Sequence, residues 1–150
     1  MYELADFAAD KLGRTVFFDP SLSMDEKTEK ALLYGNLLMN AYAETKEDFF
    51  LVIAQSFLGR MENDLFYRGG TDDAVTAVME QNLEAIAKLT ARMEENSALH
   101  EAYACHRPIG KTDNFLKWMV DYRLNTKGGR RERLLQKPEY VEILKKYTLK

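Results

Sequence analysis

The chain has little of several features that define common protein classes. Its 150 residues include one cysteine, Cys105, so no disulfide can form within the chain. The most apolar run, residues 49–54, is far shorter than the ~20 residues that a helix needs to cross a bilayer, so we expect no membrane span. Residues 1–6 lack the basic and apolar regions of a secretory signal, and we therefore expect a cytoplasmic protein.

Proline is also scarce, with three residues in the whole chain, and the segments between the prolines lack the alternation that is typical of strands. The composition, 46% hydrophobic and 30% charged, is that of a globular protein. No low-complexity tract, repeat or long linker divides the chain. The sequence therefore predicts an all-α protein in which residues 1–150 form a single-domain bundle of about five to seven helices.

The N-terminal pattern predicts a helix over residues 2–12 that Gly13 ends. Its apolar positions form one stripe, which we expect to face the core: Leu4, Phe7, Ala8 and Leu12. Residues 15–18 form the one β-like run, and because this run is short and isolated it predicts an extended connector.

Capping signals predict the next helices. Ser23 and Glu26 have the spacing of a capping box, which predicts that a second helix begins there, and Thr45 offers a similar start for a third. That third helix, residues 49–67, is apolar over most of its circumference in its first turns, and it should therefore be the largely buried central helix. Thr71 is placed to cap a fourth helix.

The fourth helix carries a regular seam with spacings of four and three residues: Val75, Met79, Asn82, Ile86, Leu89 and Met93. Asn82 either fixes the register of a paired helix or lies at the edge of an apolar stripe. Further along, Phe115, either Trp118 or Met119, and Tyr122 recur at helical spacing, and Pro138 suits the first turn of a last helix.

The charges of the chain are segregated. Residues 1–104 carry nine Lys/Arg against nineteen Asp/Glu, whereas residues 105–150 carry twelve against five. A basic cluster in the second part is the strongest functional signal, since Lys and Arg neutralise phosphates. Its candidate binding residues are Arg123, Lys127, Arg130, Arg131, Arg133 and Lys137.

The basic cluster has three interpretations. It binds nucleic acid, with Trp118 or Tyr122 stacking on a base if they are exposed; it is a solvated surface; or it complements the acidic part, within the chain or between copies. The spacing of Trp118 and Tyr122 favours core positions for both. We expect Arg130, Arg131 and Arg133 to lie outside the core.

Few residues are candidates for a nucleotide-binding, metal or catalytic site. Gly110-Lys111-Thr112 matches only the end of a phosphate-binding loop, because Cys105 stands where the motif requires glycine. His100, Cys105 and His106 are too few and too poorly spaced for a zinc site, and no third group orients a Cys105 nucleophile. We therefore expect no cofactor and no metal. The exception left open is a magnesium site on facing helices, built from acids such as Glu44, Asp48, Glu80 and Glu84.

Three functions remain as hypotheses, and no signature with its required spacing points to a family. The leading one is a non-catalytic binding or regulatory module that acts through protein–protein contacts, including self-association. The second is a nucleic-acid-binding protein that uses the basic cluster. The third is a carboxylate-metal enzyme of the helical-bundle type, which requires the acids to converge.

Overall fold

A computed structural model describes residues 2–104 and 114–148, and all the regular structure in these ranges is helical. The eight helices are α1 (Tyr2–Phe17), α2 (Met24–Thr45), α3 (Asp48–Tyr67), α4 (Asp72–Glu95), α5 (Ser97–Ala104), α6 (Phe115–Asn125), α7 (Gly129–Leu134) and α8 (Pro138–Thr148). The all-α prediction is confirmed. The helix beyond the expected five to seven is the short α7.

The chain divides into two compact units, residues 1–89 and residues 90–150, and the boundary falls inside α4. The expectation of a single domain stays a prediction. Within residues 2–104 and 114–148, no helix is both long enough and apolar enough to span a membrane.

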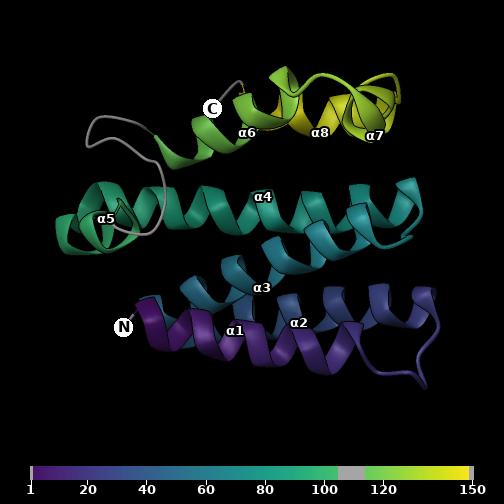
Figure 1. Ribbon diagram of the computed structural model, residues 1–150. Helices are drawn as coiled ribbons and strands as arrows, with labels where there is room; N and C mark the ends of the chain where they lie inside the picture. Colours follow the sequence, from purple (N-terminus) through teal and green to yellow (C-terminus); the bar gives the residue numbers. More distant parts are fainter. Residues whose placement is uncertain (1, 105–113, 149–150) are drawn as a thin grey trace. The chain divides into compact units, whose positions relative to one another are not determined.

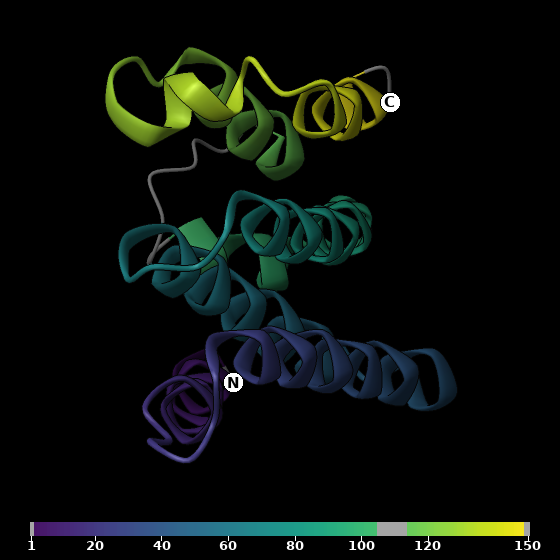
Figure 2. The same cartoon turned by 90° about the vertical axis from the view of Figure 1, so that its right-hand side faces the viewer.

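Helix α3 is the centre of the first unit. It packs against both α1 and α2 (Figures 1 and 2). Every residue from Leu51 to Leu58 is buried, including the polar Gln55 and Ser56. The prediction of a largely buried central helix is therefore confirmed, and burial on this scale is the main source of stability in such a bundle.

Helix α1 differs from the expectation in both its length and its buried face. It continues through Gly13 to Phe17, so the predicted end at Gly13 and the predicted extended connector are both wrong. The middle of its buried face consists of small residues, Ala5, Ala9 and Gly13, and the larger buried side chains lie at its two ends. Ala5 and Ala9 are completely buried, and a Cβ on Gly13 would make ordinary van der Waals contact with Met61 Cε at 3.5 Å, so this face of α1 lies against α3.

Two large apolar side chains of α1, Leu4 and Phe7, face outward, whereas Tyr2 and Phe17 at its two ends are buried. Leu4 is 62% exposed and Phe7 is 60% exposed, so the prediction that they belong to the core stripe is wrong. Apolar periodicity identifies two faces on this helix, and close approach to α3 selects the one with small residues.

The predicted capping box at the start of α2 is confirmed. The Glu26 N–H donates to Ser23 Oγ at 3.1 Å, and the Ser23 N–H donates to Glu26 Oε1 at 3.0 Å. The second predicted start is wrong, because Thr45 is the last residue of α2 and α3 begins at Asp48 without a side-chain cap. Lys46, between the two helices, has a left-handed φ of 58°.

The predicted seam of α4 is buried along its whole length, with exposures of 0% to 4%. Thr71 caps the helix as predicted, since its Oγ1 accepts the Ala74 N–H at 3.1 Å. Asn82 is fully buried, and its Nδ2 donates to Glu62 Oε1 at 3.0 Å. The amide therefore belongs to a polar pair inside the first unit, between α4 and α3.

In the second unit, α6 packs against α8, and Pro138 begins α8 as predicted (Figure 2). The start of α6 is fixed to the end of α4, because the Leu116 N–H donates to the buried Thr90 Oγ1 at 3.1 Å. The Tyr103 and Phe115 rings meet edge to face at 5.4 Å and join α5 to α6.

Candidate functional site

Two of the six predicted basic residues are buried. Arg123 is 3% exposed, and its Nη1 donates to the Met119 carbonyl at 2.9 Å. Arg131 is 5% exposed, and its Nη1 donates to the Tyr140 hydroxyl at 2.8 Å. The expectation that Arg131 lies outside the core is therefore wrong. Both guanidinium groups stabilise the second unit from within.

The other four predicted residues lie nearer the surface, with Lys127 and Arg133 exposed and Arg130 and Lys137 half-buried. They flank or belong to α7. Their role in binding an anion or a partner stays a prediction.

Trp118 and Tyr122 are not core residues, contrary to the favoured interpretation of their spacing. Trp118 is half-buried and Tyr122 is 49% exposed. Their rings stack at 6.2 Å with an interplanar angle of 26°, and the Arg131 guanidinium lies 5.6 Å from the centre of the Tyr122 ring. Tyr122 thus already contacts both an aromatic ring and a cation.

The other candidates from the sequence do not form a site in the described ranges. Cys105, His106 and the segment 110–112 lie outside those ranges, and His100 is half-buried on α5. Within residues 2–104 and 114–148, no three His, Cys, Asp or Glu side chains gather as a metal site would require. The acids considered for magnesium point to solvent or lie at the surface, with Glu44, Glu80 and Glu84 exposed and Asp48 half-buried.

Four exposed apolar side chains on α1 and α2 form what we call the apolar quartet: Leu4, Phe7, Leu33 and Leu37. Leu33 and Leu37 are 52% and 55% exposed, and they lie four residues apart on one face of α2. The sequence analysis assigned Leu4 and Phe7 to the core. Only the structure shows that the small face of α1 is the buried one.

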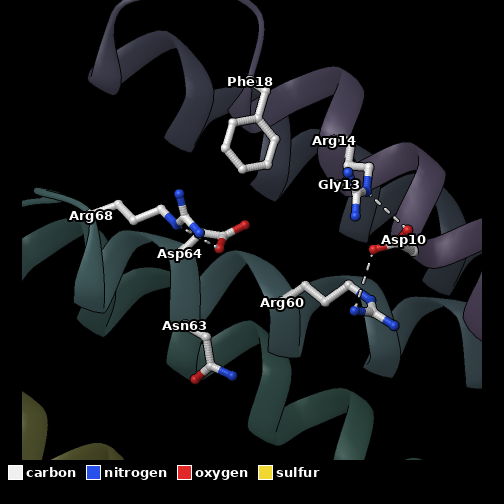
Figure 3. A pocket seen from close by; sticks show the side chains of 8 residues that line it. All are labelled: Asp10, Gly13, Arg14, Phe18, Arg60, Asn63, Asp64 and Arg68. Atoms are coloured by element: carbon white, nitrogen blue, oxygen red, sulfur yellow. Dashed lines mark hydrogen bonds and ion pairs between the residues drawn. The ribbon is translucent and has the colours of Figure 1, made fainter.

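A second feature of the first unit is a pocket of about 400 Å³ between α1 and α3 (Figure 3). We call it the arginine pocket, and its lining residues are Asp10, Gly13, Arg14, Phe18, Arg60, Asn63, Asp64 and Arg68. Figure 3 shows Arg14 on α1, and Phe18 directly after that helix, extending toward the side chains of α3.

Ion pairs order the arginine pocket. Asp10 accepts from Arg14 Nε at 3.0 Å and lies 3.5 Å from Arg60 Nη1. Arg60 Nη2 also pairs with Asp6 at 2.8 Å, and Asp6 in turn accepts the Ser56 hydroxyl at 2.7 Å. These shared carboxylates hold the Arg14 and Arg60 guanidinium groups in place.

The far end of the arginine pocket contains Asp64, Arg68 and Phe18. Burial raises the pKa of the Asp64 carboxyl above its ordinary value, and the nearby guanidinium of Arg68 opposes this rise in pKa. Arg68 Nε lies 3.6 Å from Asp64, and the Arg68 guanidinium lies 5.2 Å from the centre of the Phe18 ring.

The arginine pocket was not predicted, although the sequence contains a pattern that indicates it. Polar or charged residues recur every four positions on both helices that form the pocket. The α1 series is Asp6, Asp10 and Arg14, and the α3 series is Ser56, Arg60 and Asp64, which Arg68 continues directly after the helix. Two such series on neighbouring helices indicate two polar stripes that face each other. The α1 series reaches Arg14 only because the helix continues past Gly13.

Comparison with protein-family models, with curated proteins and with solved structures yielded no match for this chain.

Proposed function

We propose that this protein is a non-catalytic binding module that acts through protein–protein contacts, with the apolar quartet as part of its contact surface. The observation that carries the proposal is the exposure of Leu4 and Phe7, at 62% and 60%, on the outward face of α1. Single exposed apolar residues are common on protein surfaces, but large side chains that share a helical face are typical of contact surfaces.

The helical spacing of the quartet supports this proposal. Leu4 and Phe7 lie three residues apart on α1, and Leu33 and Leu37 lie four apart on α2, so each pair forms a ridge along its helix. Complete burial of one such side chain contributes about 1.5–3 kcal/mol, and each member of the quartet still has about half of its surface left to bury. Four partly exposed side chains can therefore contribute several kcal/mol to association.

The charge around the quartet indicates the kind of partner. Residues 1–89 contain eight Lys/Arg and sixteen Asp/Glu, a net charge of −8. Glu29 and Glu44 are exposed on α2, on either side of the leucine pair in sequence. A partner that presents apolar side chains flanked by basic ones complements these ridges, and the opposite charges would speed association at low salt.

The test uses Phe7→Ser and Leu37→Ser, with Tyr67→Ser as the matched control because Tyr67 is 72% exposed and lies outside the quartet. Proteins bound from a cell extract are identified by mass spectrometry after cross-linking. We expect the same basic partner to be captured by wild type and by Tyr67→Ser, and to be lost with both quartet variants.

Light scattering at low and high salt distinguishes a partner protein from a second copy. A dimer that both quartet variants convert to monomer would make the partner a second copy. Loss of partners in Tyr67→Ser to the same extent, or retention in both quartet variants, would contradict the proposal.

A further inference from the structure

The three arginines of residues 1–89 all line the arginine pocket: Arg14, Arg60 and Arg68. The same stretch has a net charge of −8, and three of its eight cations gather in this lining together with the carboxylates of Asp10 and Asp64. The lysines of this stretch do not line the pocket. Planar guanidinium groups suit the recognition of oxyanions, because their forked donors match the spacing of two phosphate or carboxylate oxygens.

Two of these arginines retain donors that internal ion pairs do not use. In the described part of the chain, the ion pair of Arg14 with Asp10 and that of Arg68 with Asp64 both use Nε. Their terminal nitrogens therefore remain for a ligand, and the side chains are 67% and 56% exposed. An arginine that served only to neutralise its own carboxylate would be expected to form the stronger bidentate pair, in which two N–H groups donate to the two carboxylate oxygens.

Arg60 forms the inner wall of the pocket. Its two terminal nitrogens are occupied by Asp6 and Asp10, while its Nε is buried and has no hydrogen-bond partner in the described residues. A buried N–H without an acceptor is costly, and an oxygen of a bound group or a water can satisfy it. Arg60 thus supplies positive charge close to the two arginines that present donors.

The lining also contains an aromatic surface. Phe18 is 52% exposed and lies beside the Arg68 guanidinium. Asn63 adds an amide to the lining, and the volume of about 400 Å³ exceeds what a lone phosphate ion requires. The pocket therefore has room for a phosphate and for an attached flat group.

We propose that the arginine pocket binds a small molecule that carries a phosphate group and a flat ring. Arg68, which lies beside Phe18, donates to the phosphate oxygens through its terminal nitrogens while the Phe18 ring contacts the flat group, and Arg14 adds positive charge and free donors from the other end of the pocket. Because this proposal uses none of the apolar quartet, it stands independently of the protein–protein contact proposed above.

The test uses three probes: phenyl phosphate, methyl phosphate and phenol. Binding is followed by the shifts of backbone amide signals, including that of Gly13, in two-dimensional NMR spectra of the 15N-labelled protein. We expect phenyl phosphate to bind most tightly, methyl phosphate about threefold to tenfold more weakly, and phenol not measurably, since the ring contact adds to a phosphate interaction that dominates.

Arg14→Gln and Arg68→Gln are the test variants, because both side chains are largely exposed and their loss should leave the fold intact. Lys88→Gln is the matched control, since it removes one positive charge from the same unit and its ion pair with Glu84 is also exposed and four residues apart. We expect each test variant to weaken phenyl phosphate about fivefold or more, the double variant to abolish binding, and the control to stay within about twofold.

Phe18→Leu checks the aromatic contribution and should make phenyl and methyl phosphate bind equally. Phe7→Ser, which alters the apolar quartet, should leave binding of phenyl phosphate unchanged. The proposal is overturned if phenyl phosphate shifts no signal of the pocket residues, or if Lys88→Gln weakens binding as much as Arg14→Gln. Thermal melts of every variant establish that the fold is retained.

Discussion

Asn82 Nδ2 donates a hydrogen bond to Glu62 Oε1 at 3.0 Å, and the two residues are 0% and 2% exposed. A carboxylate this deeply buried requires donors, and the amide supplies one of them. The pair joins α4 to α3 at the centre of the first unit.

Asn82→Ala is expected to lower the free energy of unfolding by about 1–3 kcal/mol, because it removes a donor from a buried carboxylate. The double variant Glu62→Met/Asn82→Ala should recover part of this loss, since no buried charge remains. Urea denaturation of the single and double variants measures the coupling. Strictly additive effects would show that the pair is not coupled.

Gly35 allows α2 to lie close to its neighbours. A Cβ there would lie 2.8 Å from Leu58 Cδ2 and closer still to Gln81 Oε1. Gly35→Ala should therefore destabilise the protein by about 1–3 kcal/mol through overpacking, despite the better helix propensity of alanine.

Gly59→Ala is the control for this prediction, because the nearest atom to its Cβ would be Gln55 Nε2 at 3.5 Å. It should stabilise α3 by up to about 1 kcal/mol. Thermal unfolding followed by circular dichroism compares the two variants, and equal effects would refute the close approach at Gly35.

The capping box of α2 should make stability depend on pH. The backbone N–H of Ser23, followed by its hydroxyl, holds the pKa of Glu26 below its ordinary value of 4.5. The stabilisation is therefore fully present above 4.5 and is lost as the pH falls through the lower pKa of the folded state.

Glu26→Ala should accordingly lower the Tm at neutral pH and have a smaller effect in acid. Glu29→Ala, an exposed change on the same helix, is the control. Ser23→Ala removes the other half of the box and should cost about 0.5–2 kcal/mol. A Tm difference between Glu26→Ala and wild type that does not vary with pH would argue against a role for the ionised carboxylate.

Asp64 should make the stability of the protein depend on pH in the opposite direction. Burial raises the pKa of Asp64, so between its ordinary value of 3.8 and this raised value the folded state holds more protons than the unfolded state. Through that window, stability falls as the pH rises. Asp64→Asn removes this contribution, and its Tm at neutral pH should not be lower than that of wild type. A clear fall in Tm would show that the Arg68 ion pair outweighs the cost of burial.

Arg131 is expected to behave as a structural residue. Arg131→Gln should cost about 1.5–3 kcal/mol, because it leaves the Tyr140 hydroxyl and the Tyr122 ring without their cation. Lys127→Gln, an exposed change in the same basic cluster, should leave the Tm unchanged. Equal melting curves for the two variants would contradict the assignment.

The sequence predicted the parts of the fold that depend on local rules. Residues within a few helical turns were sufficient to predict three features: the Ser23 cap, the α4 seam from Val75 to Met93 and the helix start at Pro138. The face of α1 could not be predicted in this way, since both faces carry apolar residues and only close packing on α3 selects the small one. That error also hid the arginine pocket, because Arg14 and Phe18 follow Gly13.

The basic cluster shows that composition alone does not predict which charged side chains are exposed. Its six cations are equivalent in the sequence, but Arg123 and Arg131 enter hydrogen bonds with partners that only the tertiary structure supplies. Counting charges therefore overestimates the cationic surface of the second unit.

The burial of these two arginines has a consequence for how trypsin would cut residues 114–148. A protease must draw several residues of extended backbone into its active site, so a peptide bond after a buried arginine inside a helix is protected. Lys127 is exposed and lies between α6 and α7, directly before Gly128 with its positive φ of 88°. The first tryptic cleavage in this stretch should fall after Lys127, and it would separate α6 from α7 and α8.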